Sequence, residues 1–202
     1  MAIDTFEAEN KNKLETYEWD DMWWDNSGDE DTHILVIGDS ISRGYRHILK
    51  EVTGGKWRID NFASSKAVDN EFLKKALDMA ISQQEKYDLI LFNNGLHGWH
   101  LSSDEYGKHY MSVLQHLMSK NISMAVILTT PWLDERNRLV KERNEKAISC
   151  AEKFGIPVID VYSLIEGHEE LYGLPDTIHL KKEGYTKLAE HIYKSAKEIL
   201  GK

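Results

Sequence analysis

The stretch His33-Ile34-Leu35-Val36-Ile37-Gly38-Asp39-Ser40-Ile41-Ser42-Arg43-Gly44 joins a short apolar run to a small polar corner. Its aliphatic, largely β-branched start is typical of a strand that is buried on both faces. Gly38 permits a tight turn, and Ser40 falls where a following helix should begin. In an open α/β sheet, ligands bind beyond the carboxyl ends of the strands. Ser40 is therefore either placed to meet a ligand or an ordinary helix N-cap.

Strand-like and helix-like segments alternate along the rest of the chain. Strands are expected near residues 33–39, 57–62, 88–94, 123–130 and 158–162, and helices near 40–52, 67–84, 102–120, 135–154 and 181–200. Such alternation predicts βαβ units with right-handed crossovers and one parallel sheet covered by helices. We therefore expect an α/β fold, a three-layer α/β/α sandwich around a flavodoxin-like five-stranded parallel sheet.

An acidic arm that carries tryptophans precedes the alternating part of the chain. We assign residues 1–31 to this arm and residues 32–202 to a single domain, because no repeat or low-complexity linker divides them. The segment Trp19-Asp20-Asp21-Met22-Trp23-Trp24-Asp25 could pack its indoles on the domain or place rings at the rim of a site. Packing is favoured, since large aromatic side chains mostly supply buried area. Trp23 and Trp24 could also belong to a homo-oligomer interface.

The composition excludes several classes of protein. A net charge of −9 argues against nucleic acid or an anionic membrane as the main partner, because both require clustered cations. No apolar run approaches the roughly 20 residues that span a bilayer. Residues 1–7 lack the basic and apolar regions of a signal peptide, so we expect a cytoplasmic protein. The single Cys150 rules out an internal disulfide and is typical of a small core residue.

Polar or glycine-rich loops follow four of the predicted strands, at residues 38–40, 63–65, 93–97 and 129–132. In a parallel sheet these loops gather at one edge, and the loop with Asp176 and His179 can reach it. A serine nucleophile needs a base to take its proton and a third group to orient that base. Ser40, His179 and Asp176 offer this set. The alternatives are a surface or capping role for His179 and a turn role for Asp176.

Two motifs and their places in the chain resemble those of the GDSL/SGNH hydrolase family. Gly38-Asp39-Ser40 follows the first strand, and Asp176-Thr177-Ile178-His179 precedes the last helix. The continuation His179-Leu180-Lys181-Lys182-Glu183-Gly184-Tyr185 also resembles the final block of that family. The resemblance covers residues 32–200. The Gly-x-Ser-x-Gly motif of the α/β-hydrolases is absent, because position 42 is serine.

The resemblance implies a serine esterase or lipase-like hydrolase that uses no metal and no other cofactor. Carried over to this sequence, Ser40 is the nucleophile, His179 the base and Asp176 the acid that orients it. The backbone N–H of Ser40, at a helix N-terminus, would form part of the oxyanion hole.

Two blocks depart from the family pattern at the expected oxyanion hole. The second block normally offers a glycine amide, but Ala63-Ser64-Ser65-Lys66 contains no glycine, so Ser65 or Lys66 would have to donate. The third block normally has asparagine where this chain has His97. An imidazole can donate one N–H, so His97 could keep the role, or Asn94 could replace it.

Three further residues follow the third and fourth strands on the expected rim. Trp99, His100 and Trp132 could stack on a sugar, line an acyl pocket or cover the end of the sheet. A metal site of His97, His100 and His179 is disfavoured, because no carboxylate or cysteine stands at ligand spacing.

We therefore expect a carboxylic ester hydrolase that acts through an acyl-enzyme and removes acetyl groups from a carbohydrate. Its partner would be a small-molecule or oligosaccharide ester. The polar, histidine- and tryptophan-bearing rim favours a sugar. A lysophospholipase or thioesterase for longer acyl chains is the alternative among enzymes. The altered second and third blocks also leave open a non-catalytic binding module on the same fold.

Overall fold

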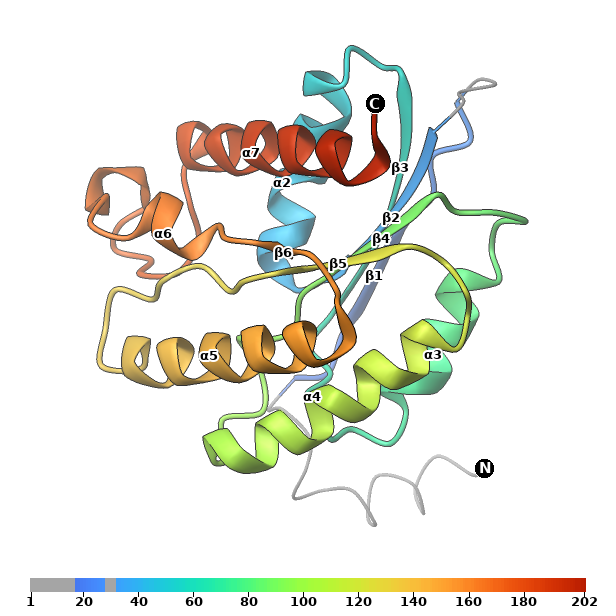
Figure 1. Ribbon diagram of the computed structural model, residues 1–202. Coiled ribbons are helices and arrows are strands. Elements are labelled where there is room, and N and C mark those ends of the chain that lie inside the picture. The colour runs from blue at the N-terminus through green and yellow to red at the C-terminus, as the bar shows by residue number, and fades with distance from the viewer. Residues whose placement is uncertain (1–16, 28–31) are drawn as a thin grey trace.

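A six-stranded sheet between two layers of helices forms the centre of the molecule (Figure 1). The computed structural model describes residues 17–27 and 32–202, so residues 1–16 and 28–31 of the predicted arm lie outside the described residues. The strand order is β1-β3-β2-β4-β5-β6. The strands are β1 (Asp20–Trp23), β2 (Thr32–Gly38), β3 (Trp57–Ser64), β4 (Leu89–Phe92), β5 (Met124–Ile127) and β6 (Val158–Ile159).

The five strands from β2 to β6 pair in parallel, in the flavodoxin-like order that we predicted. All seven residues of β2 are buried, as expected for a central strand that is covered on both faces. The chain runs from β2 to β3 on one side and then returns to β4 on the other side. The direction in which strands are added to the sheet therefore reverses between β2 and β4. The carboxyl ends of these two parallel strands are where such folds bind ligands.

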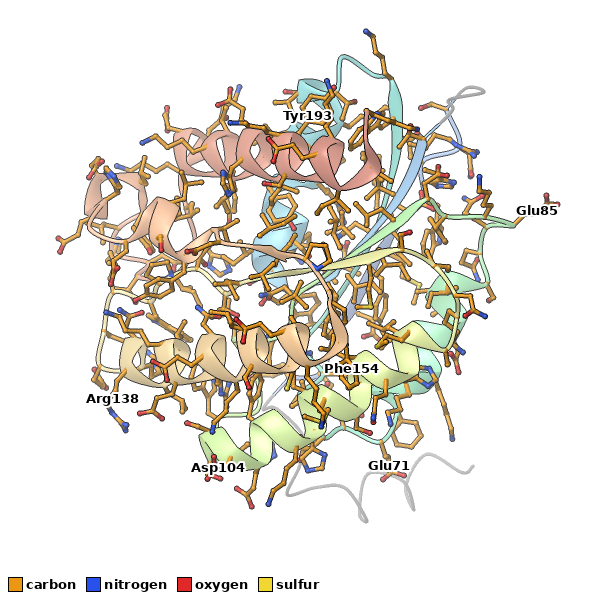
Figure 2. The ribbon with its side chains drawn as sticks, in the orientation of Figure 1. Glu71, Glu85, Asp104, Arg138, Phe154 and Tyr193 are labelled. Carbon is orange, nitrogen blue, oxygen red and sulfur yellow. The ribbon has the colours of Figure 1, made fainter. Side chains whose placement is uncertain are left out.

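The two faces of the sheet are covered by different helices (Figure 1). Helices α2 (Ser40–Val52) and α7 (Lys182–Leu200) pack together on one face. Helices α3 (Leu73–Ile81), α4 (Ser103–Met118) and α5 (Asn137–Phe154) cover the other face, where α4 packs against α5. In Figure 2, Asp104 and Arg138 mark the starts of α4 and α5 on the same side of the molecule. Both helices therefore start beyond the carboxyl edge of the sheet.

Local sequence signals explain where several helices begin. Asp39 is the N-cap of α2, and its side chain accepts a hydrogen bond from the amide of Ile41. Ser102 and Glu105 form a capping box at the start of α4. Helix α3 begins later than predicted, because the Asn70 side chain accepts a hydrogen bond from the Phe72 amide and folds the preceding residues into a turn.

Strand β1 is the main feature that the predicted five-stranded sheet lacked. It comes from the arm and pairs antiparallel with β3, with Asp20 opposite Ser64 and Trp23 opposite Asn61. Because the pairing is antiparallel, the start of β1 lies at the carboxyl edge of the parallel strands. The short helix α6 (Tyr162–Ile165) and the 3-10 turn η1 (Glu169–Leu171) were also not predicted. They lie between β6 and the loop that carries Asp176.

Two further sequence expectations concern the core and the membrane. Cys150 is buried, as expected for a small core residue. Among residues 17–27 and 32–202, none of the helices has the length and apolar character needed to cross a bilayer.

Candidate active site

Ser40 is the first residue of α2, at the corner where β2 ends. It is not the N-cap of the helix, because Asp39 takes that position and accepts the Ile41 amide at 2.9 Å. The alternative of a capping serine is therefore wrong. The Ser40 hydroxyl instead lies 2.8 Å from Nε2 of His179. The backbone amide of Ser40 is in the first turn of α2, where helix N–H groups have no partner within the helix.

His179 and Asp176 lie in one loop and are hydrogen bonded to each other. Nδ1 of His179 is 2.7 Å from Oδ2 of Asp176. The other carboxylate oxygen of Asp176 accepts the amides of Ile178 at 2.9 Å and His179 at 3.0 Å. The structure thus brings Ser40, His179 and Asp176 into one continuous chain of hydrogen bonds. The side chains of His179 and Asp176 are each 43% exposed, so a ligand can reach them from solvent.

The hydrogen bonds around Asp176 determine its charge. Burial alone would raise the pKa of this carboxyl, but the amides of His179 and Ile178 and the His179 ring outweigh it and lower the pKa below its usual value. Asp176 is therefore ionised at neutral pH. An ionised carboxylate accepts the Nδ1 proton of His179, which leaves Nε2 to accept the hydroxyl proton of Ser40.

The loop that carries Asp176 and His179 is fixed from two sides. On one side, the Trp132 indole donates to Oγ1 of Thr177 at 3.0 Å, and the Leu133 amide donates to the Thr177 carbonyl at 2.9 Å. On the other side, the Gly173 amide donates to the His179 carbonyl at 2.9 Å. The loop is therefore held between the segment after β5 and the residues that follow the 3-10 turn η1.

The second predicted loop is occupied by the arm. The Ser65 amide donates to the Trp19 carbonyl at 3.0 Å, and the Trp19 amide donates to the Ser65 hydroxyl at 2.8 Å. The Lys66 amide donates to the Ser64 hydroxyl at 3.0 Å. Both amide hydrogens are already donated within this region, which removes Ser65 and Lys66 from the candidate oxyanion donors.

The third loop places Asn94 and His97 in different surroundings. Asn94 is buried, and its side-chain amide donates to the Lys66 carbonyl at 2.8 Å, so it joins the second and third loops. His97 is half-buried, and its ring meets that of Trp19 edge-on, with 6.2 Å between the centroids. Burial raises the pKa of the Asp39 carboxyl, while the imidazoles of His97 and His179 oppose this effect. His97 and His179 are thus both close enough to Asp39 to act on its charge.

Arg143, on α5, anchors the third loop and was missed in the sequence. Its fully buried guanidinium donates to the carbonyls of Gly95 at 2.9 Å, His97 at 2.8 Å and Gly98 at 2.6 Å. The signal was available, because Arg143 stands on the apolar stripe of a helix whose other buried positions include Val140, Ala147 and Cys150. A charged residue on such a stripe needs polar partners inside the protein.

The predicted rim residues contact neighbouring side chains, with Trp99 and Trp132 half-buried and His100 exposed. The Trp99 and Trp132 rings meet edge to face, with 5.1 Å between their centroids, and the Arg136 guanidinium stands 3.8 Å from the centroid of Trp132. One face of Trp132 is therefore covered. His100 is 2.9 Å from a carboxylate oxygen of Asp69. Within the described ranges 17–27 and 32–202, no group of three or more possible metal ligands gathers.

The tryptophans of the arm divide between packing and the rim of the site. Trp24 packs against the core. Trp23 is 42% exposed and meets His47 at 4.4 Å between ring centroids. Trp19 lies beside His97 and beneath the guanidinium of Arg43, at the carboxyl edge of the sheet. The arm thus forms one wall of the candidate site.

Comparisons with known proteins rest on the fold alone. No family model and no curated protein matches the sequence. Among solved structures, an acetyl xylan esterase named AlAXEase aligns with a TM-score of 0.67 at 16% identity, over 81% of this chain and 98% of that chain. A G-D-S-L family lipolytic protein from Veillonella parvula aligns with a TM-score of 0.67 at 18% identity, over 81% and 97% of the two chains.

A third similar structure is the lipase/acylhydrolase from Enterococcus faecalis, with a TM-score of 0.67 at 18% identity, over 84% of this chain and 96% of that chain. The chain has the fold of the GDSL/SGNH hydrolases. The SGNH fold predicted from the two motifs is therefore confirmed, with β1 added at one edge. In this SGNH fold, the corner after β2 carries Ser40 and the loop before α7 carries Asp176 and His179.

Proposed function

We propose that the protein is a serine ester hydrolase that acts through an acyl-enzyme. The observation that carries this proposal is the chain of hydrogen bonds from Ser40 through His179 to Asp176, with contacts of 2.8 Å and 2.7 Å. A base within hydrogen-bond reach of a serine, itself oriented by a carboxylate, is the arrangement that activates a serine nucleophile. The solved structures of the same fold are named as esterases and lipolytic proteins, which supports the same reaction class.

The mechanism follows from the direction of these hydrogen bonds. Nε2 of His179 removes the hydroxyl proton of Ser40 as Oγ attacks the ester carbonyl. The tetrahedral intermediate then collapses, and the imidazolium returns the proton to the leaving alcohol. Water, activated by the same imidazole, attacks the acyl group on Ser40 and releases the acid. Asp176 stays ionised throughout and stabilises the imidazolium.

The oxyanion hole in this proposal consists of the Ser40 amide and the ring N–H of His97. The Ser40 amide lies at the N-terminus of α2, where the helix dipole favours negative charge. His97 occupies the third loop, close enough to act on Asp39, next to the corner that carries Ser40. Asn94 remains the alternative, because its side-chain amide donates one hydrogen to the Lys66 carbonyl and carries a second one.

We further propose that the acyl group is acetyl and that the alcohol is a carbohydrate. The buried cavity next to the Ser40 corner, lined by Asp39, Ile41 and Leu96 among others, has a volume of about 20 Å³ and is not lined by Ser40 or His179. It has room for about one water molecule, so it adds no space for a long acyl chain beside Ser40. One similar structure is an acetyl xylan esterase, which also favours the acetyl assignment. Stacking of a sugar on Trp132 is not part of this proposal, because Arg136 covers one face of that ring and Trp99 contacts it as well.

The test compares the wild type with Ser40→Ala on p-nitrophenyl acetate and on acetylated oligosaccharides. Ser82→Ala, an exposed serine whose hydroxyl bonds to the Met79 carbonyl, is the matched control. We expect Ser40→Ala to lose both turnover and labelling by a fluorophosphonate probe, while Ser82→Ala keeps both. Ligand binding without turnover or labelling in the wild type would instead identify a binding module.

An acyl-length series on the same enzyme separates the acetylesterase from its alternative. We expect the rate to fall beyond short chains. A rate that rises steeply with chain length would identify a lysophospholipase or thioesterase. The G-D-S-L lipolytic names among the similar structures are the reason to include this arm.

A further inference from the structure

Arg43 is an exposed cation on the same face of α2 as Ser40. It stands three residues after Ser40 in the first turns of the helix. Side chains at this spacing are neighbours, with about 5–6 Å between their Cβ atoms. Burial raises the pKa of the Tyr185 hydroxyl to about 12, and the charges of Asp176 and Arg43 both act on this hydroxyl. Arg43 therefore borders the proposed catalytic centre.

Trp19 supports the guanidinium of Arg43 from the arm. The central carbon of the guanidinium lies 5.5 Å from the centroid of the Trp19 ring. Trp19 is itself fixed, because its backbone exchanges two hydrogen bonds with Ser65. A guanidinium held over an aromatic ring by cation–π attraction keeps its N–H groups for hydrogen bonds to other acceptors. The support thus orients Arg43 without using its donors.

Three other cations beside the arm are neutralised. Lys66 pairs with Asp20 at 2.7 Å, Lys50 pairs with Asp25 at 2.8 Å, and Arg46 pairs with Asp21. Arg43 has no carboxylate partner among residues 17–27 and 32–202. The net charge of the chain is −9, so an arginine without a carboxylate partner is unusual here. Its position beside Ser40, which is hydrogen bonded to His179, suggests a role in the site.

We propose that Arg43, held by Trp19, binds a carboxylate on the alcohol part of the ester substrate. This inference rests on the proposed esterase function and narrows its substrate to acidic esters, such as an acetylated acidic sugar. The planar guanidinium matches a carboxylate through two parallel N–H···O bonds. A single guanidinium among neutralised cations suits a monoanion better than a phosphate dianion. Arg43 is thus a specificity-determining residue, and Trp19 is the positioning residue behind it.

The experiment uses pairs of acetyl esters that differ only in charge. The pairs are 4-acetoxybenzoate with 4-acetoxybenzamide, and 3-acetoxybenzoate with 3-acetoxybenzamide. For each pair, the ratio of kcat/KM for the acid to that for the amide is measured in the wild type, Arg43→Gln and Arg43→Lys. Comparing the ratio between variants cancels the intrinsic reactivity of each ester. Arg46→Gln is the matched control, because it removes one arginine charge from the same helix at an ion-paired position.

We expect Arg43→Gln to lower the acid-to-amide ratio about 10- to 100-fold for at least one pair, the usual value of a hydrogen bond to a charged group. Arg43→Lys should recover only part of the ratio, since lysine lacks the planar fork. Arg46→Gln should leave it within about twofold, as for a surface ion pair. A ratio that is the same in Arg43→Gln and the wild type overturns the inference while leaving the esterase proposal intact.

A binding measurement keeps the two proposals distinguishable. Calorimetry on Ser40→Ala with 4-acetamidobenzoate and 4-acetamidobenzamide reports recognition of the anion without turnover. We expect the acid to bind more tightly than the amide, and Arg43→Gln in the same background to remove the difference. If the acid and the amide bind alike, the inference is wrong. If the wild type hydrolyses none of the four esters and the fluorophosphonate probe does not label Ser40, the esterase proposal fails. This inference then fails with it.

Discussion

The indole N–H of Trp132 donates to Oγ1 of Thr177 at 3.0 Å, between Asp176 and His179 in the sequence. This bond ties the segment after β5 to the loop that holds the proposed base. We expect Trp132→Phe to lower kcat about 10-fold with little change in KM, because small displacements of reacting groups are costly. Steady-state kinetics on p-nitrophenyl acetate measure both constants.

Thr177→Val is the control for this role, since it removes the same bond from the other side. Its effect should match that of Trp132→Phe, and the double variant should be no worse than either single variant. An increase in KM alone in Trp132→Phe would instead support the direct contact with substrate that the sequence first suggested.

Asp176→Asn tests the orienting carboxylate. The amide can no longer accept Nδ1–H of His179 in the same way, so the wrong imidazole tautomer faces Ser40. A loss of kcat of about 10³–10⁴ is expected, as in serine hydrolases with this change. The double variant Ser40→Ala with His179→Ala should be as inactive as Ser40→Ala alone, because residues that act as a unit are not additive. Additive losses would mean that His179 does not act through Ser40.

His97 is tested by two replacements with different donors. His97→Ala should lower kcat about 10²-fold, the usual cost of losing one oxyanion donor. His97→Asn restores a side-chain N–H and should recover part of that loss. Thermal unfolding of both variants checks that the third loop remains folded. Wild-type kcat in His97→Ala would return the role to Asn94 or to the backbone alone.

Arg143 is expected to dominate the stability of the third loop. Arg143→Met keeps much of the side-chain volume but leaves the carbonyls of Gly95, His97 and Gly98 without their donor. Each unsatisfied buried group costs about 1–3 kcal/mol, so the free energy of unfolding should fall by at least about 3 kcal/mol. Urea denaturation measures this change. Lys146→Met, at an ion-paired position on the same helix whose side chain is 40% exposed, should change it little, and a similar loss in both variants would contradict the anchor role.

Asp25 makes the stability of the arm contacts depend on pH. Burial alone would raise its pKa, but hydrogen bonds from Lys50, from Ser27 and from the Ile59 amide lower the pKa to about 2. The pKa of Asp25 is lower in the folded than in the unfolded protein. Its contribution to the free energy of unfolding is therefore fully present above the unfolded pKa of about 3.9 and is lost as the pH falls toward 2. Asp25→Asn should therefore cost about 2 kcal/mol at pH 7, and the difference from the wild type should vanish near pH 2. A cost that does not depend on pH would show that packing, not charge, is lost.

The parallel part of the fold was predictable because its signals are local. The bounds of α2 at residues 40 and 52 agree with the predicted helix, since a polar corner starts it and a glycine pair follows it. Strand β1 was not predictable in the same way. Asp20 and Asp21 have low strand propensity, and only pairing with β3, far along the chain, makes this segment a strand.

The candidate site shows the same division. Ser40, Asp176 and His179 stand in two short motifs whose places in an α/β chain can be read from the sequence. The Ser65 amide donates to the carbonyl of Trp19, 46 residues earlier, and the Asn94 side chain donates to the Lys66 carbonyl. Such contacts between distant segments leave no periodic signal. Arg143 is intermediate, because its position on an apolar stripe indicates burial but not which carbonyls it binds.

Strand β1 also changes what the sheet exposes to other protein chains. Without it, the eight residues of β3 would form a long open edge, which is a template for edge-to-edge aggregation. β1 replaces this edge with one of four residues, two of which are aspartates, and charged short edges discourage such pairing. The segment that positions Trp19 beneath Arg43 therefore also protects the solubility of the folded protein.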